Sequence, residues 1–445
     1  MKHTTILMCG IALATSCQSK PTDKTVTHFK LPAPSVSDSQ AMPDSLFTLD
    51  ENIDLQTEWQ RTYAAALNAN GDIIAAKARY NAALQKSQIV GSLPEPMLML
   101  GGFIQPVETR NGPMDFKVGL SQRFPWQARL DSMTDQQRYA AQSLAAAVVD
   151  KQLRLRQQLT DMWAKRILLD RKISLTEAQL SVMRHIEDLV MAKFESGRAS
   201  QSKVLRTQLA TTKLEDKVFA LMAAADLLDS KIYAASNFDV TQVDWSDQQY
   251  PLSGFTTRDF SGYTVRPRLL QIELQMQAAA SAVKVANLAS MPDFNVGVDY
   301  TMIGDGNPSM ATSGDDAIGV QLSFALPFGN RPYEAIKMQA KQMQQSLRFK
   351  LLQATRNLDA EITNSLTLGD DAQRRVELYR DKLIPRAEST IEATLQAFTS
   401  NQASLQDVLD VSTLILEYKI QLETAHADVC SARAIVAGAI LVNDE

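Results

Sequence analysis

The segment FESGRASQSKVL, residues 194–205, returns 204 positions later as FTSNQASLQDVL, residues 398–409. Six of the twelve positions are identical at this constant offset, which chance rarely produces. The identical pairs are Phe194 and Phe398, Ser196 and Ser400, Ala199 and Ala403, Ser200 and Ser404, Val204 and Val408, and Leu205 and Leu409. The period is far longer than the roughly 20–50 residues of a solenoid repeat, so the pattern predicts two copies of one large structural unit.

Each copy lies between two helical stretches. No proline interrupts the chain from about Gln127 to Lys193, and such a helix would reach roughly 100 Å. Apolar residues recur there at spacings of three and four, at Leu155, Leu159, Met162, Leu169, Ile173, Leu180, Met183, Val190 and Phe194, with interruptions at Arg166, Thr176 and Glu187. Similar seams follow each copy, at Leu214, Val218, Leu221, Ala225, Leu228 and Ile232, and at Tyr418, Leu422, Ala425, Val429, Ala432 and Val436. These coiled-coil seams predict two antiparallel hairpins with the repeated segment at their tips, where Gly197 and Asn401 can adopt a left-handed cap conformation.

Alternating runs of about ten residues precede the long helices. Every second residue is apolar in DFNVGVDYTM, residues 293–302, and in AIGVQLSFAL, residues 317–326. The first half repeats this pattern in DFKVGLSQRF, residues 115–124, whereas its partner near PMLMLGGFIQ alternates poorly. The pattern predicts two strand pairs, joined by the polar loops PVETRNGPM and IGDGNPSMATSGDD.

Two interpretations of these strands stay open on the pattern alone. They suit a transmembrane barrel with one face toward lipid, and they also suit a water-soluble sheet packed on helices. In the second loop, Asp305, Asn307, Asp315 and Asp316 could offer oxygen ligands to calcium. The spacing of a helix-loop-helix calcium site is absent, which favours a solvated loop.

The composition narrows the function classes. The 445 residues carry a net charge of -5 with no basic run, so nucleic acid is not an expected partner. Four scattered histidines and the lack of a nucleophile or phosphate-loop motif predict no enzyme, no catalytic residue and no cofactor. Seventeen methionines could suggest a soft metal ion, but their spacing favours packing, so we assign no metal site.

The N-terminus, MKHTTILMCGIALATSC, has the features of a processing signal. Lys2 precedes a short apolar core that is too short to span a bilayer, and small residues lead into Cys17. This arrangement resembles a bacterial lipobox, in which the cysteine carries acyl chains such as palmitate; simple secretion or a buried structural Cys17 are the alternatives. Residues 17–54 are polar and proline-rich, which predicts a tether. With Cys9 in the signal, only Cys430 remains, so an internal disulfide would require a free Cys17.

Together, the signal, the two repeats, the strand pairs and the Gly or Asn tips resemble the TolC family of outer-membrane efflux channels. Further landmarks are SLPEP at Ser92 and SMPDF at Ser290, GLSQRFPW at Gly119 and LSFALPFGN at Leu322, and RPRLL at Arg266. The resemblance implies a mainly α fold with a transmembrane β part, made of two pseudo-repeats, each helix-strand-strand-long helix-helix. Three protomers would each contribute four strands to one shared β-barrel above a long α-helical barrel.

On this resemblance, the chain divides into six parts. They are a signal peptide at 1–16, a lipid-anchored tether at 17–54, a first efflux repeat at 55–235 with strands about 97–108 and 115–125, an equatorial linker at 236–262, a second repeat at 263–440 with strands about 293–304 and 317–328, and a tail at 441–445.

The resemblance also implies roles for residues near the tips. Asp407 and Asp410 match a pair of aspartates that ring the periplasmic entrance in the family. At the offset of 204, Lys203 and Arg206 occupy the equivalent positions of the first repeat with the opposite charge, which suggests a charged gate. The tips Ser196, Gly197, Arg198 and Ser400, Asn401, Gln402 would dock a periplasmic adaptor. Trp126 would lie in an aromatic girdle at the membrane edge, or else be a core residue at a helix start.

We therefore expect an outer-membrane lipoprotein that extends into the periplasm and passively exports substrates. An adaptor and an inner-membrane pump of RND or ABC type would open it. The alternative is a structural coiled-coil lipoprotein without a pore. Metals, drugs and secreted polypeptides all stay open as substrates, with a slight preference for metals from SLPEPM and GLSQRFPW.

Overall fold

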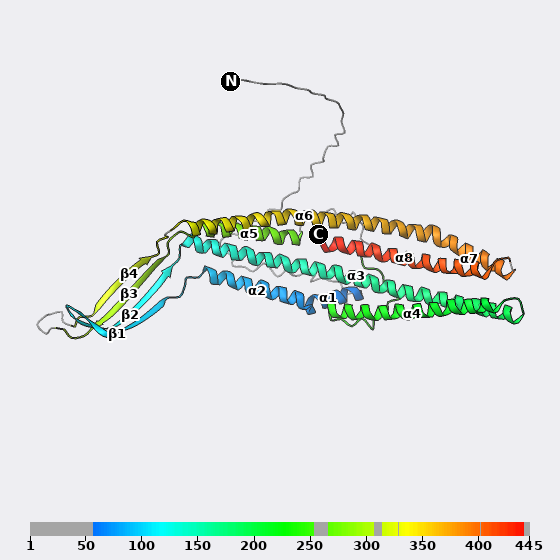
Figure 1. Ribbon diagram of the computed structural model, residues 1–445, viewed down its shortest axis with the longest axis horizontal. Coiled ribbons are helices and arrows are strands. Elements are labelled where there is room, and N and C mark those ends of the chain that lie inside the picture. The colour runs from blue at the N-terminus through cyan, green and yellow to red at the C-terminus, as the bar shows by residue number, and fades with distance from the viewer. Residues whose placement is uncertain (1–56, 253–265, 307–313, 328, 401, 440–445) are drawn as a thin grey trace, which may run out of the picture. The chain divides into compact units, whose positions relative to one another are not determined.

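The computed structural model describes residues 57–252, 266–306, 314–327, 329–400 and 402–439. These residues belong to one unit, Gln40–Glu445, which Figure 1 shows as a ribbon. The expected signal peptide, Cys17, the tether and Asn401 lie outside the described residues.

Both halves of the chain have the same order of elements, which confirms the predicted fold class. The first half contains α1 (Glu58–Ala69), α2 (Gly71–Gly91), β1 (Met97–Thr109), β2 (Gly112–Phe124), α3 (Gln127–Glu195) and α4 (Gln201–Ser236). The second contains α5 (Pro267–Asn287), β3 (Phe294–Ile303), β4 (Ala317–Phe324), α6 (Arg331–Leu378), a π-helical turn η3 (Tyr379–Leu383), α7 (Ile384–Thr399) and α8 (Leu405–Ala439). Only α1 has no counterpart among the described residues.

The long helices run from the sheet to the tips (Figure 1). α3 is 69 residues long, or about 100 Å, and it packs against α2, α4, α5 and α8. In the second half, α6, η3 and α7 together correspond to α3. The start of α6 and the end of α7 lie 204 positions after the start and the end of α3. Pro385, which has no N–H to donate and whose ring crowds the carbonyl one turn back, lies two residues after the end of the π-helical turn. No helix in the described part of the chain is both long and apolar enough to cross a bilayer.

The predicted seams form the contacts between the helices. On α4, Val218, Ala225 and Ile232 are buried, and the seam residues between them are half-buried. On α3, Leu155, Leu159, Leu180, Met183 and Val190 are buried. The coiled-coil prediction is therefore confirmed for both helices of the first hairpin.

Two of the expected interruptions on α3 prove to be part of the seam. Thr176 is fully buried, and its hydroxyl donates to the carbonyl of Lys172 at 2.7 Å. Arg166 is buried because its Nε donates to Asp229 of α4 at 2.8 Å and its guanidinium lies 4.6 Å from the Trp245 ring centroid. A polar side chain can occupy a seam when a hydrogen bond to its own helix or to the partner helix offsets the cost of its burial.

The four strands form one antiparallel sheet in the order β1-β2-β3-β4. Leu120 pairs with Val298, and Val298 pairs with Val320. Directly paired residues share a face, so the apolar side chains of these strands gather on one face. The opposite face carries Lys117 and Asp299, joined by a 2.9 Å ion pair, and one glycine from each strand: Gly101, Gly119, Gly297 and Gly319.

The apolar face of this sheet is not covered by any of the described residues. Ile318 is 75% exposed and Val320 is 78% exposed. No helix of the described residues packs across the sheet; the helices continue from its end (Figure 1). The interpretation of the strands as a water-soluble sheet packed on helices is therefore wrong, because that arrangement would bury these side chains.

The first loop between strands is shorter than the sequence indicated. β1 continues to Thr109 and β2 begins at Gly112, so most of PVETRNGPM is strand. Gly112 has φ +138°, and a Cβ atom there would lie 1.9 Å from the carbonyl oxygen of Gly304, so only glycine fits this turn. The register of the first strand shifts between Gly102 and Val107, which interrupts its alternation beyond Gly102, whereas the apolar run Met97–Leu100 lies in the regularly paired part.

The Arg166–Asp229 pair yields a prediction about stability. Replacing Arg166 with alanine leaves the Asp229 carboxylate, 14% exposed, without its cation, and we expect a loss of up to about 3 kcal/mol. Burial already raises the pKa of Asp229, and losing the Arg166 hydrogen bond raises it further. The deficit should be largest near neutral pH and shrink as the pH falls toward that raised pKa, where the carboxyl takes up a proton.

Denaturant unfolding followed by circular dichroism measures this effect. Arg184→Ala is the matched control, because Arg184 forms an exposed pair with Glu215 on the same two helices and should cost about 0–1 kcal/mol. Equal losses in the two variants at all pH values would contradict the assignment.

Candidate functional site: the two helical tips and the sheet

The first tip joins α3 to α4. Gly197 has φ +70°, which confirms the predicted left-handed conformation. The backbone N–H groups of Arg198 and Ala199 both donate to the carbonyl of Lys193, at 2.7 and 3.0 Å. The Ser196 hydroxyl donates to the last turn of α3. These bonds satisfy carbonyls that the helix end would leave without partners.

The second tip repeats this geometry at the offset of 204. The N–H groups of Gln402 and Ala403 donate to the carbonyl of Ala397 at 2.7 and 3.1 Å, and the Ser400 hydroxyl donates to the last turn of α7. Asn401 itself lies outside the described residues. All five described candidate docking residues, Ser196, Gly197, Arg198, Ser400 and Gln402, are exposed.

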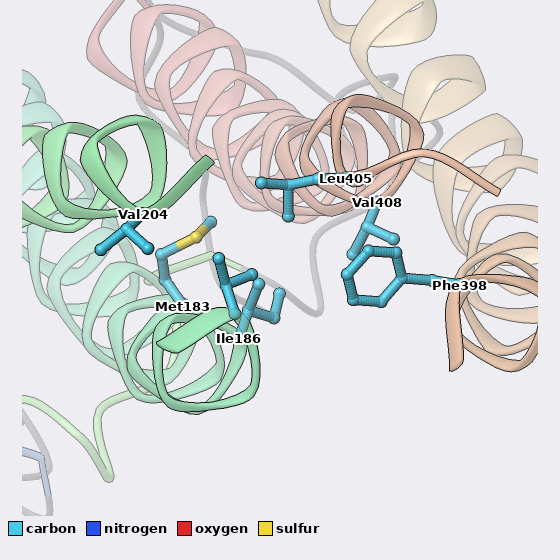
Figure 2. Close-up of a cluster of buried hydrophobic side chains, with 7 residues drawn as sticks. Met183, Ile186, Val204, Phe398, Leu405 and Val408 are labelled. Atoms are coloured by element: carbon cyan, nitrogen blue, oxygen red, sulfur yellow. The ribbon is translucent and has the colours of Figure 1, made fainter. Parts of the chain in front are cut away.

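One apolar cluster joins the two hairpins behind the tips. Figure 2 shows side chains from α3, α4, α7 and α8 that converge here. The cluster, which we call the tip core, consists of Met183, Ile186, Val190, Val204, Phe398, Leu405 and Val408. Lys193 of α3 adds a polar link, since its Nζ donates to the carbonyl of Phe398 at 3.0 Å and lies 4.0 Å from that ring centroid. The two tips of one chain are therefore packed against each other.

The four candidate gate residues are exposed on α4 and α8, beside the tip core. Asp407 caps its own helix: its carboxylate accepts from the N–H and hydroxyl of Ser404, at 2.8 and 2.7 Å, and Ser404 Oγ accepts from the N–H of Asp407. The Ser404 hydrogen bonds lower the pKa of Asp407, so this carboxylate is ionised at neutral pH.

Gln406 connects charges of the two repeats. Its amide donates to Asp410 at 2.7 Å and accepts from Arg206 at 3.5 Å. Within the described part of one chain, neither aspartate forms an ion pair with Lys203 or Arg206. The structure thus brings Arg206 and Asp410 to one site through Gln406, whereas Asp407 is engaged with Ser404.

Ser404 and Gln406 were missed at the level of sequence. For Ser404 the signal was present, because Ser404 and Asp407 have the Ser-x-x-acid spacing of a capping box. The equivalent Ser200 of the first tip makes no such side-chain bond, and a lysine stands where Asp407 stands. Gln406 gave no signal, because its partner Arg206 is 200 residues away.

A shallow groove of about 520 Å³ runs between α7 and α8 next to the second tip. Small side chains line it, among them Thr390, Ala393, Ala397 and Ala403, and Asp407 stands at its edge. Such a surface permits close approach of another helix, because few atoms project from it.

Trp126 occupies the position just before α3, where its carbonyl accepts the first helical hydrogen bonds. Its ring lies 6.3 Å from that of Phe294 at the start of β3, and it is 36% exposed. The reading of Trp126 as a core residue is therefore wrong, although its place at a helix start is confirmed.

Among the described residues, no three His, Cys, Asp or Glu side chains are placed to share a metal ion. Packing within the chain accounts for Met183, in the tip core, but not for Met338 and Met343, which expose more than half of their surface on α6.

Comparison with known proteins gives one family match. The model of the outer membrane efflux protein family matches residues 62–225, which lie in the first repeat. The pyoverdine export outer membrane protein OpmQ of Pseudomonas putida is 23% identical over an alignment that covers 98% of this chain and 96% of its own.

Solved structures share the fold. The outer membrane protein VceC from Vibrio cholerae superposes with a TM-score of 0.72 at 16% identity, covering 86% of this chain and 96% of its own. The open state of the Neisseria gonorrhoeae outer membrane channel MtrE gives a TM-score of 0.70 at 13% identity, covering 86% of this chain and 88% of its own.

The capping box of the second tip yields a matched pair of variants. Ser404→Ala removes both side-chain bonds to Asp407, so we expect the first turn of α8 to lose about 1 kcal/mol and the pKa of Asp407 to rise. Ser200→Ala, at the equivalent place in the first tip, removes no capping bond and should change little. Amide hydrogen exchange measured by mass spectrometry on peptides from each tip distinguishes them, and equal acceleration in both tips would show that the capping bond contributes nothing.

Proposed function

Because the chain is a member of the outer membrane efflux protein family, we propose that three copies assemble into one channel that spans the outer membrane and the periplasm. The protein is an outer-membrane efflux channel. We propose in addition that it is a trimer, and we propose its partners and its cargo. In it, four strands from each copy close a shared barrel and the helices enclose a tunnel.

The uncovered sheet is the observation that supports assembly into a trimer. Its apolar face suits lipid and its polar face suits a water-filled interior. The outer edges of β1 and β4 have no partner strand among the described residues. Within a bilayer such edges must pair, so β1 of one copy would bond to β4 of the next until the sheet closes. Three copies give twelve strands, a number within the range of membrane barrels.

The rival function, a coiled-coil lipoprotein without a pore, leaves this sheet unexplained. Such a protein would have no use for an exposed apolar face that continues over four strands.

The partners would act at the tips. We propose that adaptor hairpins dock on the two exposed tips and in the groove beside α7 and α8, whose small side chains support close helix packing. An inner-membrane pump of RND or ABC type would supply the energy, because the chain carries no recognisable nucleotide-binding motif. Lipidation of Cys17 would anchor the mature N-terminus beside the barrel.

The cargo would enter from the periplasm or from the inner-membrane pump. OpmQ is named for the export of pyoverdine, which makes pyoverdine a cargo to test beside metal ions, drugs and secreted polypeptides.

The charges behind the tips would hold the resting gate closed. In our proposal, Asp407 and Asp410 of one copy face Lys203 or Arg206 of its neighbour, and adaptor docking breaks these links. Each exposed pair would contribute only about 0–1 kcal/mol, but three symmetric sets add up to a bias on a two-state gate. The intrachain bridge from Arg206 through Gln406 to Asp410 supports the placement of these charges in one network.

Two adjacent residues of β4 test the assignment of the faces. Val320→Arg puts a charge on the apolar face, and each copy should lose about 2–4 kcal/mol of insertion free energy if the site is near the bilayer midplane. We expect loss of the detergent-resistant trimer from the outer-membrane fraction. Gln321→Arg, on the opposite face, should leave the trimer intact. Dye accumulation in a strain lacking the wild-type gene should rise with Val320→Arg alone, and normal trimers from both variants would refute the arrangement.

A second experiment tests the gate. Asp407→Ala with Asp410→Ala should raise the resting single-channel conductance in planar bilayers and weaken cation selectivity, because the carboxylates at the entrance are lost. Lys203→Glu with Arg206→Glu should also open the pore. Ser404→Ala is the control, since it removes the capping bonds of Asp407 but keeps its charge. Conductance that rises as much in Ser404→Ala would attribute the effect to helix fraying, and unchanged conductance in both charge variants would eliminate the gate.

A further inference from the structure

Three charged side chains meet where the sheet joins the helices. Arg123, near the end of β2, directs Nε and Nη2 to Oδ2 of Asp293 at 3.1 and 2.5 Å. Arg129, in the first turn of α3, directs Nη2 to Oδ1 of the same carboxylate at 2.5 Å. We call Arg123, Arg129 and Asp293 the junction cluster.

The junction cluster carries an excess positive charge. Two guanidinium groups share one carboxylate, and each carboxylate oxygen is taken by a different arginine. Two other carboxylates of the surrounding segments are Glu95, before β1, and Asp131, two residues after Arg129. Neither forms an ion pair with the two arginines in the described part of the chain, and Asp131 accepts from Gln127 instead.

Access to that excess charge is through Arg123. Its side chain is 61% exposed, whereas Arg129 is 20% and Asp293 only 10% exposed. Alternation along β2 places Arg123 on the same face as Lys117, the polar face of the sheet. Its Nη1 has no acceptor among the described residues. An arginine held by a carboxylate on one side, with free donors on the other, is arranged to receive a second oxyanion.

The polar face also carries one ion pair whose two charges balance. Lys117 pairs with Asp299 at 2.9 Å, and Asp299 lies against Gly319, where an added Cβ would come within 2.8 Å of its carboxylate. The opposite charges of Lys117 and Asp299 are thus held close together, so their electrostatic potentials largely cancel at a distance. In contrast to that pair, the junction cluster at the helix end of the face holds two cations against one carboxylate.

Resting on the proposed channel, we infer that Arg123 is a specificity-determining residue of the barrel lining, which binds and favours anionic cargo. The three copies of Arg123 would form a ring between the helical tunnel and the barrel. The ligand class is a solute that carries carboxylate, sulfate or phosphate groups, since a guanidinium fork matches the geometry of these oxyanions. Asp293 and Arg129 position Arg123 and need not touch the cargo.

Block of the channel by a polyvalent oxyanion tests this inference. Full-length trimers are placed in planar bilayers, and inorganic tripolyphosphate is added on the side of the sheet, away from the tips. Tripolyphosphate should reduce the wild-type current. With Arg123→Gln, the concentration for half-block should rise about tenfold, as expected for the loss of a charge-assisted hydrogen bond. Arg123→Lys, which keeps the charge, should restore part of the block.

Arg184→Gln is the matched control, because Arg184 is 60% exposed and paired with Glu215 on the helices, outside the sheet. It should leave the block unchanged. A detergent-resistant trimer on gels establishes that each variant is assembled. The same half-block in wild type and Arg123→Gln would overturn this inference and leave the channel standing. Assembled trimers that carry no current either as wild type or with Asp407→Ala and Asp410→Ala, which should open the gate, would overturn the channel itself.

Discussion

The backbone of a strand at the edge of a sheet has donors and acceptors that must find partners, and in lipid water cannot supply them. The four-stranded sheet of this protein has two such edges and one uncovered apolar face. The open edges are costly in lipid, and the apolar face is costly in water. Closure between copies would pair the edges, and lipid around the closed barrel would cover the apolar face. The sheet therefore constrains the rest of the molecule: the helices that continue from its end must also tolerate neighbouring copies, which fits the exposed Phe219 and Leu227 on α4.

The two repeats keep one backbone and change the side chains on it. The tips have the same hydrogen-bond geometry, yet Phe398 is buried in the tip core while its counterpart Phe194 is 41% exposed. Likewise Ser404 caps α8 through Asp407, whereas Ser200 faces a helix with Lys203 at that place. A repeated segment thus fixes the turn, because the backbone requirement is local. The surroundings of each copy then decide which of its side chains pack and which stay in solvent.

Sequence patterns predicted the features that depend on local periodicity. Spacings of three and four located the helical seams, alternation located the strands, and Gly197 located the first tip. The patterns could not predict what depends on distant partners. In the sequence, Arg166 interrupts the apolar seam of α3. Its burial is explained only by its contacts with Asp229 and Trp245. The junction cluster joins residues 164 and 170 positions apart, and Gln406 meets Arg206 across 200 positions. Such contacts are set by the topology, which periodicity alone does not specify.

The second long helix shows how length is conserved when local winding is not. Pro385 removes one backbone donor, and the π-helical turn before it rearranges the hydrogen bonds of Tyr379–Leu383 without changing the offset of 204 at either end of the helix. The long helical segments of the two hairpins therefore have the same number of residues. Beyond this turn α7 buries only Ala387 and Phe398. The contact of α7 with the first tip is thus concentrated on the Phe398 ring in the tip core and on the Lys193 ammonium, which lies over that ring and donates to the Phe398 carbonyl.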